Sequence, residues 1–116
     1  MLPRQQRLKR EEISRILKKG KGWRGQGLSL KIAPLLSQPS TPSQVAIIVT
    51  SGTVRTAVTR NRLKRRLRQW VIRHRSQIRP GQGVIILAYP PAAKLTIGDL
   101  GTMLQLLFTR AKMLTA

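Results

Sequence analysis

The sequence predicts an α+β domain in which a small mixed sheet is packed by helices. Short apolar runs rich in β-branched residues alternate along the chain with amphipathic segments of helical spacing, and this alternation predicts the fold class. The length of 116 residues corresponds to one domain. A chain of this size buries roughly 60–70% of its unfolded surface, which suffices for one core. We therefore expect a single domain over residues 1–116, without an internal repeat.

The N-terminal part predicts a lead-in, a helix and a connector. Residues 1–6 indicate extended chain. Residues 8–19 predict a helix, because apolar residues recur at helical spacing and two lysines precede a helix-ending Gly20. Those apolar residues are Leu8, Ile13, Ile16 and Leu17. The stretch GKGWRGQG at 20–27 is Gly-rich and basic, which predicts a connector or a simple hairpin. It matches neither the Walker nor the Rossmann pattern.

Two strands are expected next. In residues 27–34 every second residue is a large apolar one, which predicts a strand with one buried face. That face consists of Leu28, Leu30 and Ile32. Residues 45–50, VAIIVT, are nearly all apolar and β-branched, which predicts a central strand. The polar loop at 35–44 contains two prolines and leaves room for a further strand near 35–38.

The second half predicts a helix, a strand and a helix. A basic helix is expected at about 58–77, between the turn SGTVRT and the helix stop RPGQG. VIILAY at 84–89 predicts a second central strand, and 96–114 predicts a closing helix that begins with a capping box of Thr96 and Asp99. Its inward side chains are Leu100, Met103, Leu104, Leu107 and Phe108. From these patterns the order is α-β-β-α-β-α.

Charge dominates the composition. Twenty-three Lys and Arg face three acids, Glu11, Glu12 and Asp99, for a net charge of +20. Self-repulsion on this scale favours a polyanionic partner, with nucleic acid first and an anionic membrane surface second. The absence of Cys excludes disulfides and thiolate chemistry, and one His with three acids makes a protein metal site or an acid–base pair hard to assemble. Without a long apolar run or a secretory signal, we expect a cytoplasmic protein and no membrane span.

The basic helix points to nucleic acid. From Arg60 to Arg75 it holds eight Lys or Arg in sixteen residues and no acid. Its apolar stripe is Leu63, Leu67, Trp70, Val71 and His74. Ordinary surfaces mix charges of both signs, and the planar fork of Arg suits phosphate. The sequence therefore predicts phosphate contact along this helix, with Trp70 in the core and His74 in the core or at its boundary. Two alternatives stay open elsewhere: the stretch at 20–27 as a flexible loop that contacts RNA, and Trp23 either stacked on a base or packed locally.

The segment TAVTRNRLKRRLRQ, residues 56–69, resembles the RNR signature of the bacterial ribonuclease P protein subunit. The matching residues are Ala57, Val58, Arg60, Asn61, Arg62, Leu63, Lys64, Arg65, Leu67 and Arg68, with Gln69 where Glu is commoner. The opening LPRQQRL, the strand VAIIVT and the segment VIILAYPPAA extend the resemblance along almost the full chain. The implied fold is α-β-β-β-α-β-α with a left-handed βαβ crossover, against the usual right-handed rule.

The resemblance also implies a function. The family's subunit binds a catalytic RNA and helps it cleave the 5′ leader from precursor tRNA, while Mg²⁺ is bound mainly by the RNA. No protein catalytic residue, no membrane and no obligate protein partner are implied. The residues implied to contact the catalytic RNA are Arg60, Asn61, Arg62, Lys64, Arg65 and Arg68. A ribosomal or other structural RNA-binding protein, or a membrane-active cationic protein, shares the charge but does not predict the RNR signature.

A second implied surface is a cleft that holds the single-stranded leader, between the first helix and the sheet. By alignment it maps onto Ile13, Leu17, Leu28 and Lys31. Many relatives carry aromatics at these places and this chain carries none, so apolar contact and the charge of Lys31 would replace stacking. Core packing is the alternative role for the three apolar residues. A further departure lies at 51–55, SGTVR, where relatives usually carry lysines.

Overall fold

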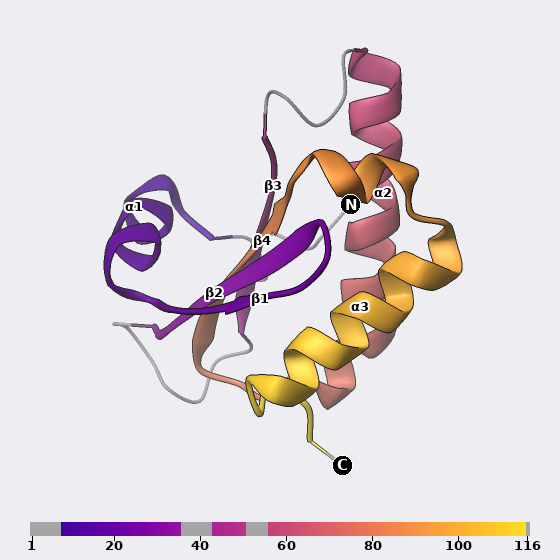
Figure 1. The fold of residues 1–116 in the computed structure, drawn as a ribbon. Helices are drawn as coiled ribbons and strands as arrows, with labels where there is room; N and C mark the ends of the chain where they lie inside the picture. The colour runs from indigo at the N-terminus through magenta and orange to yellow at the C-terminus, as the bar shows by residue number, and fades with distance from the viewer. Residues whose placement is uncertain (1–7, 36–42, 51–55, 116) are drawn as a thin grey trace.

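A four-stranded sheet lies between helix α1 on one face and helices α2 and α3 on the other (Figure 1). The computed structural model describes residues 8–35, 43–50 and 56–115. The helices are α1 (Arg10–Lys19), α2 (Ala57–His74) and α3 (Ile97–Arg110), with short 3₁₀ turns η2 (Arg75–Gln77) and η3 (Pro90–Lys94). The strands are β1 (Lys21–Arg24), β2 (Leu28–Pro34), β3 (Gln44–Val49) and β4 (Gln82–Ala88). The predicted α+β class is confirmed.

The sheet is mixed, with the strand order β1-β2-β4-β3. β2 pairs antiparallel with both β1 and β4, whereas β3 and β4 pair in parallel and are joined through α2. A parallel pair needs such a crossover, and α2 supplies it. The left hand of this crossover stays an expectation from the resemblance.

β1 corrects the element order expected from the patterns. The stretch 20–27, predicted as a connector or a hairpin, forms a hairpin in which Trp23 pairs with Leu30. Gly27 in its turn has φ +79°, and a Cβ there would meet the Ala92 backbone nitrogen at 2.6 Å. The order is therefore α-β-β-β-α-β-α, as the resemblance implies.

The location predicted for the additional strand was a different one, near 35–38. Leu35 lies outside every strand, and 36–38 fall outside the described residues, as do the lead-in at 1–6 and the departure at 51–55.

β3 is at the edge of the described sheet, so the prediction of a central strand at 45–50 was wrong. Its two faces are nevertheless both covered. Val45 and Val49 are buried in the core beneath α2 and α3, while Ala46 and Ile48 pack against the cluster beneath α1. A continuous apolar run thus indicates that both faces of a strand are covered. It does not indicate that the strand has a neighbouring strand on each side.

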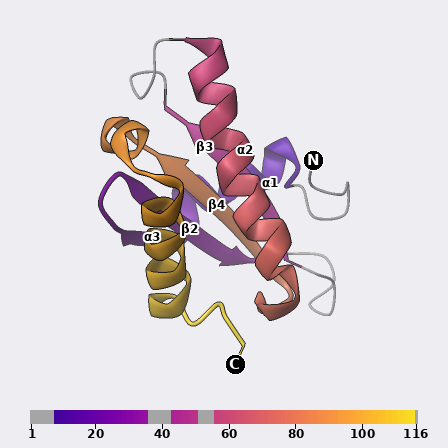
Figure 2. The same cartoon turned by 90° about the vertical axis from the view of Figure 1, so that its right-hand side faces the viewer.

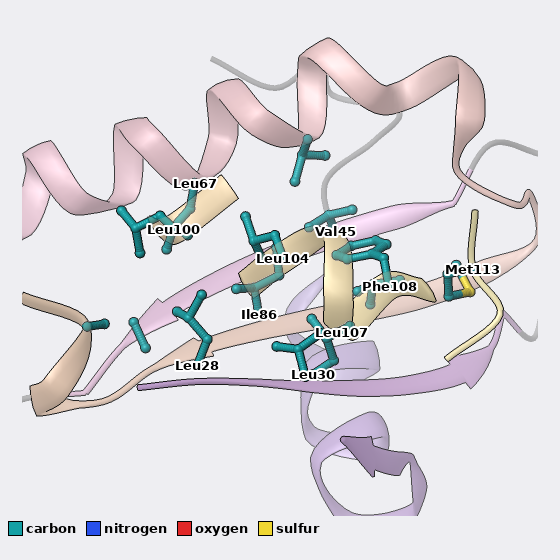
Figure 3. Close-up of a cluster of buried hydrophobic side chains, with 14 of the residues drawn as sticks. Leu28, Leu30, Val45, Leu67, Ile86, Leu100, Leu104, Leu107, Phe108 and Met113 are labelled. Carbon is teal, nitrogen blue, oxygen red and sulfur yellow. The ribbon is translucent and has the colours of Figure 1, made fainter. Parts of the chain in front are cut away.

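Two apolar clusters hold the layers together. The larger lies between the sheet and helices α2 and α3 (Figure 3), and Phe108, Leu104 and Leu107 from α3 are fully buried in it. The smaller lies beneath α1 and consists of Leu8, Ile16, Ala33, Leu35 and Ile85. The expected capping box of α3 is present: Thr96 Oγ1 accepts from the Asp99 N–H at 3.1 Å, and the Asp99 carboxylate accepts from the Thr96 N–H at 3.3 Å.

Candidate nucleic-acid interface

The buried stripe of α2 fixes which of its side chains point outward. The helix is 18 residues long, and Leu63, Leu67 and Val71 are buried in the larger cluster. Thr56 starts it, because its side chain accepts a hydrogen bond from the Thr59 N–H at 3.2 Å. Docking three apolar residues on one side leaves the cations from Arg62 onward on the remaining circumference, while Arg60 is in line with the stripe one turn before Leu63.

The structure brings four of the six predicted RNA-binding residues together along one side of α2, with the other two flanking them. At about 100° per residue, four of them share an arc of roughly 100°, and the other two lie just beyond its edges. The four are Asn61, Lys64, Arg65 and Arg68, and the other two are Arg60 and Arg62. Three of the six are exposed and three are half-buried. A continuous ridge of donors results, which can follow a phosphate backbone.

Among the described residues, no carboxylate forms an ion pair with this ridge. Within the described part of the chain the one ion pair joins Arg15 and Glu12 in α1, at 2.5 Å, on the other face of the sheet. The first turn of α2 contains no acid, although the positive end of the helix dipole lies there. Phosphate groups would supply the missing negative charge, and arginines bind them with paired hydrogen bonds.

The predicted leader-cleft residues divide between the two faces of the sheet. Ile13 and Leu17 lie on α1; Ile13 packs against the smaller cluster, and Leu17 is 38% exposed. Lys31 is half-buried and pairs with Ile85, a member of that same cluster. Three of the four predicted residues therefore lie on the α1 side of the sheet. Apolar surface lies there beside the cation of Lys31, an arrangement that suits a single-stranded nucleic acid.

Leu28 is not brought together with the other three. It is fully buried in the larger cluster, beneath α2 and α3. Side chains alternate between the two faces of a sheet along each strand, so residues 28 and 31 of β2 point to opposite faces. The geometry gives Leu28 the role of core packing.

Sequence reasoning missed Tyr89, which directly follows β4. With Arg24, Ser29 and Lys31 it borders a hollow of about 320 Å³ at the β1–β2 hairpin. Tyr89 is half-buried, and its backbone N–H donates to the Gly27 carbonyl at 2.8 Å. The alternation of side chains along a strand could have identified Tyr89, since residues 85, 87 and 89 share one side of an extended segment. An aromatic ring therefore lies beside Lys31, although none occupies the four aligned positions.

The remaining predicted features have mainly structural roles. Trp23 packs on the larger cluster, as does Trp70, which lies half-buried against Phe108 with ring centroids 5.0 Å apart. His74 is a boundary residue, as predicted: it is half-buried and stacks on Trp70. The described residues contain no group of three His, Cys, Asp or Glu that could hold a metal ion. Of the described helices, none is long and apolar enough to cross a membrane.

Comparisons with known proteins agree on one family. The family model described as Ribonuclease P matches residues 2–112. The ribonuclease P protein component of Pseudanabaena sp. (strain PCC 6903) is 36% identical over 115 residues, covering 98% of this chain and 97% of that protein. The corresponding protein of Mycobacterium sp. (strain KMS) is 35% identical over 113 residues, covering 97% of this chain and 94% of its own length.

Solved structures share the fold. The RNase P protein of Staphylococcus aureus superposes with a TM-score of 0.85 at 24% identity, over 95% of this chain and 98% of that one. The RNase P protein of Thermotoga maritima gives a TM-score of 0.78 at 21% identity, over 90% and 96%.

Proposed function

The chain belongs to the ribonuclease P protein family, and we propose that it is the protein subunit that binds the catalytic RNA and the 5′ leader of precursor tRNA. In this role it promotes removal of the leader in the cytoplasm and so forms the mature 5′ end. The observation that carries the proposal is the ridge of α2, where Arg60, Lys64, Arg65 and Arg68 have no acidic partner among the described residues.

The RNA does the chemistry in this proposal. The protein's donor set supports this division of labour, since its three acids are spread over α1 and α3 and no described cluster suits Mg²⁺. Mg²⁺ would be held mainly by the RNA subunit, where it supplies activation of the attacking water. The ridge then fixes the position of phosphates, and its contacts carry little sequence readout.

The leader is proposed to run along the α1 side. Leu17 offers exposed apolar surface there, Lys31 offers charge, and Tyr89 offers a ring in the hollow beside Lys31. This side is separated by the sheet from the ridge of α2, so two RNA segments can be bound at once (Figure 1).

The decisive experiment is cleavage of precursor tRNA at low Mg²⁺ by a bacterial ribonuclease P RNA, with and without the chain. We expect protein-dependent maturation of the 5′ end and no cleavage by the protein alone. Polylysine is the control for generic charge. Stimulation no greater than that by polylysine would overturn the proposal and favour a ribosomal or other structural RNA-binding protein.

The ridge is tested by replacing Arg60 and Arg65 together with Ala. Both side chains reach solvent, so the fold should persist while the affinity for the catalytic RNA falls and the salt slope decreases by about two. Unchanged affinity would contradict the assignment of the ridge.

A further inference from the structure

We propose that the groove between α2 and α3 is a second contact site for the ribonuclease P RNA, one that takes an unpaired nucleotide. Its phosphates would lie beside Arg66 and Arg73, and its base would stack on His74. The inference rests on the proposed function, and it adds a site on the flank of α2 beyond Arg62, opposite Lys64 and Arg68.

Helices α2 and α3 both cover one face of the sheet (Figure 2). The groove between them is a cavity of about 500 Å³. This is the size range of a small-ligand site. From α2 it is lined by Arg66, Gln69, Trp70, Arg73 and His74, and from α3 by residues between Ile97 and Gln105.

Two arginines give the groove its positive charge. Arg66 and Arg73 are seven residues apart, so they lie on one side of α2 about 10 Å apart along its axis. At 100° per residue they point away from Lys64 and Arg68, and Arg62 is the member of the ridge nearest to them. None of the lining residues is acidic, and neither arginine pairs with a carboxylate in the described residues.

The groove also has an aromatic wall. The His74 ring stacks on Trp70 with centroids 4.2 Å apart and planes 21° apart, and Trp70 rests against Phe108. The imidazole is held from a second direction, since Nδ1 lies 2.8 Å from the Trp70 carbonyl oxygen and must donate to it. A half-buried, oriented ring on the wall of a cationic groove offers a face on which a base can stack.

Two glycines of α3 keep the groove open. Gly98 and Gly101 both line it, although glycine is among the poorest helix formers. A Cβ on Gly98 would meet only Thr96 Oγ1, at 3.8 Å, and one on Gly101 would meet Trp70 Cδ1 at an ordinary 3.5 Å. Alanine would therefore fit at both positions, so packing does not account for the glycines. Because glycine has no side chain, the groove stays unfilled at both positions.

The position of the groove indicates which RNA supplies the bound nucleotide. The proposed leader path lies on the α1 face, across the sheet from this groove, so the leader does not reach it (Figure 1). The ridge on the same helix is already assigned to the catalytic RNA, and a second segment of that RNA meets matching positive charge here. We therefore commit to the RNA subunit as the source of the nucleotide.

A filled groove provides the first test. Gly98→Leu places a branched side chain in the open space, whereas Gly98→Ala adds one methyl group and is the matched control. Both replacements raise helix propensity, and the far-UV circular dichroism of each variant checks that the fold persists. With a bacterial ribonuclease P RNA transcript, we expect Gly98→Leu to weaken binding about tenfold or more, as loss of one stacked base does. Gly98→Ala should bind like the parent chain.

Charge provides the second test. Arg66→Ala with Arg73→Ala should lower the salt slope of binding to the same transcript by about two. The charge-matched control is Arg10→Ala with Arg110→Ala, two exposed residues in α1 and α3 that do not line the groove. The control should leave the slope unchanged.

The outcomes separate the two proposals. If the parent chain stimulates cleavage and the groove variants behave like their controls, the groove site is wrong and the proposed function stands. If the parent chain does not stimulate cleavage beyond polylysine, the proposed function fails and the groove site fails with it. Loss of binding by Gly98→Leu and by the arginine pair, with both controls intact, supports the groove site.

Discussion

Helices α2 and α3 together cover one face of the sheet, whereas α1 alone covers the other (Figure 1). The first face buries a cluster that includes Phe108, Leu104 and Leu107, all fully inaccessible. The second buries five residues and leaves Ile48 and Leu87 half-buried. The difference indicates a division of work: one face supplies most of the stability and carries its charge outside, and the other keeps apolar surface near Lys31 accessible to a ligand.

The largest expected effect tests that division with two leucines. Leu104→Ala removes a fully buried side chain from the α2–α3 side and should lower the free energy of unfolding by about 3–5 kcal/mol. Leu87→Ala removes a half-buried one from the α1 side and should lower it by about 1 kcal/mol. Urea unfolding of both variants measures the two losses. Equal losses would contradict the division between the faces.

The second prediction concerns ligand binding on the α1 side. Tyr89→Ala should weaken binding of precursor tRNA by the holoenzyme by about 1–3 kcal/mol, the contribution of one stacked base, and leave mature tRNA binding unchanged. Tyr89→Phe keeps the ring and is the control. The comparison requires equilibrium binding of both tRNA forms. Parallel weakening for precursor and mature tRNA would place the role of Tyr89 in folding.

The helices were the most predictable part of the fold. In α2, Leu63, Leu67 and Val71 repeat at helical spacing, and in α3 the Thr96–Asp99 pair marks the first turn. Both signals are local, because a helix satisfies its backbone within itself. The helix pattern also placed most cations of α2 outside the buried stripe, whereas the choice of six residues for RNA binding came from the resemblance and stays a prediction.

The strands and the second site depend on contacts between distant segments. KGWR forms β1 only because β2 offers it a partner, and β3 lies at the edge although its composition is that of a covered strand. Leu28 and Lys31 were assigned to one cleft, but the pleat places them on opposite faces. The groove beside Trp70 needs the position of α3 relative to α2, which no single helix pattern contains.

A smaller effect is expected at the start of α3, the helix that contributes most to the larger cluster. Thr96→Ala removes the hydroxyl that accepts from the Asp99 N–H, and should lower the free energy of unfolding by about 1 kcal/mol. Thr96→Ser keeps the acceptor and should retain most of the stability. A Thr96→Ala variant as stable as the parent chain would show that tertiary packing alone sets the first turn.

The smallest expected effect is at the ion pair of α1. Arg15 Nη2 donates to Glu12 Oε2 at 2.5 Å and to the Pro34 carbonyl oxygen at 2.8 Å, so the arginine ties α1 to the end of β2. Glu12→Gln removes one charge and should lower the free energy of unfolding by less than about 1 kcal/mol, since both side chains are about one-fifth exposed.

Glu11→Gln is the matched control for this pair. Glu11 lies in the same first turn and is exposed, and it forms no ion pair with another described residue. Both replacements remove one of three acids from a chain of net charge +20, so they change the overall repulsion equally. The difference between their unfolding free energies isolates the Arg15 contact, and that difference should shrink when salt rises from about 0.05 to about 0.5 M. A difference that persists at high salt would mean that the hydrogen bond between Glu12 and Arg15, rather than the net charge of the pair, stabilises α1.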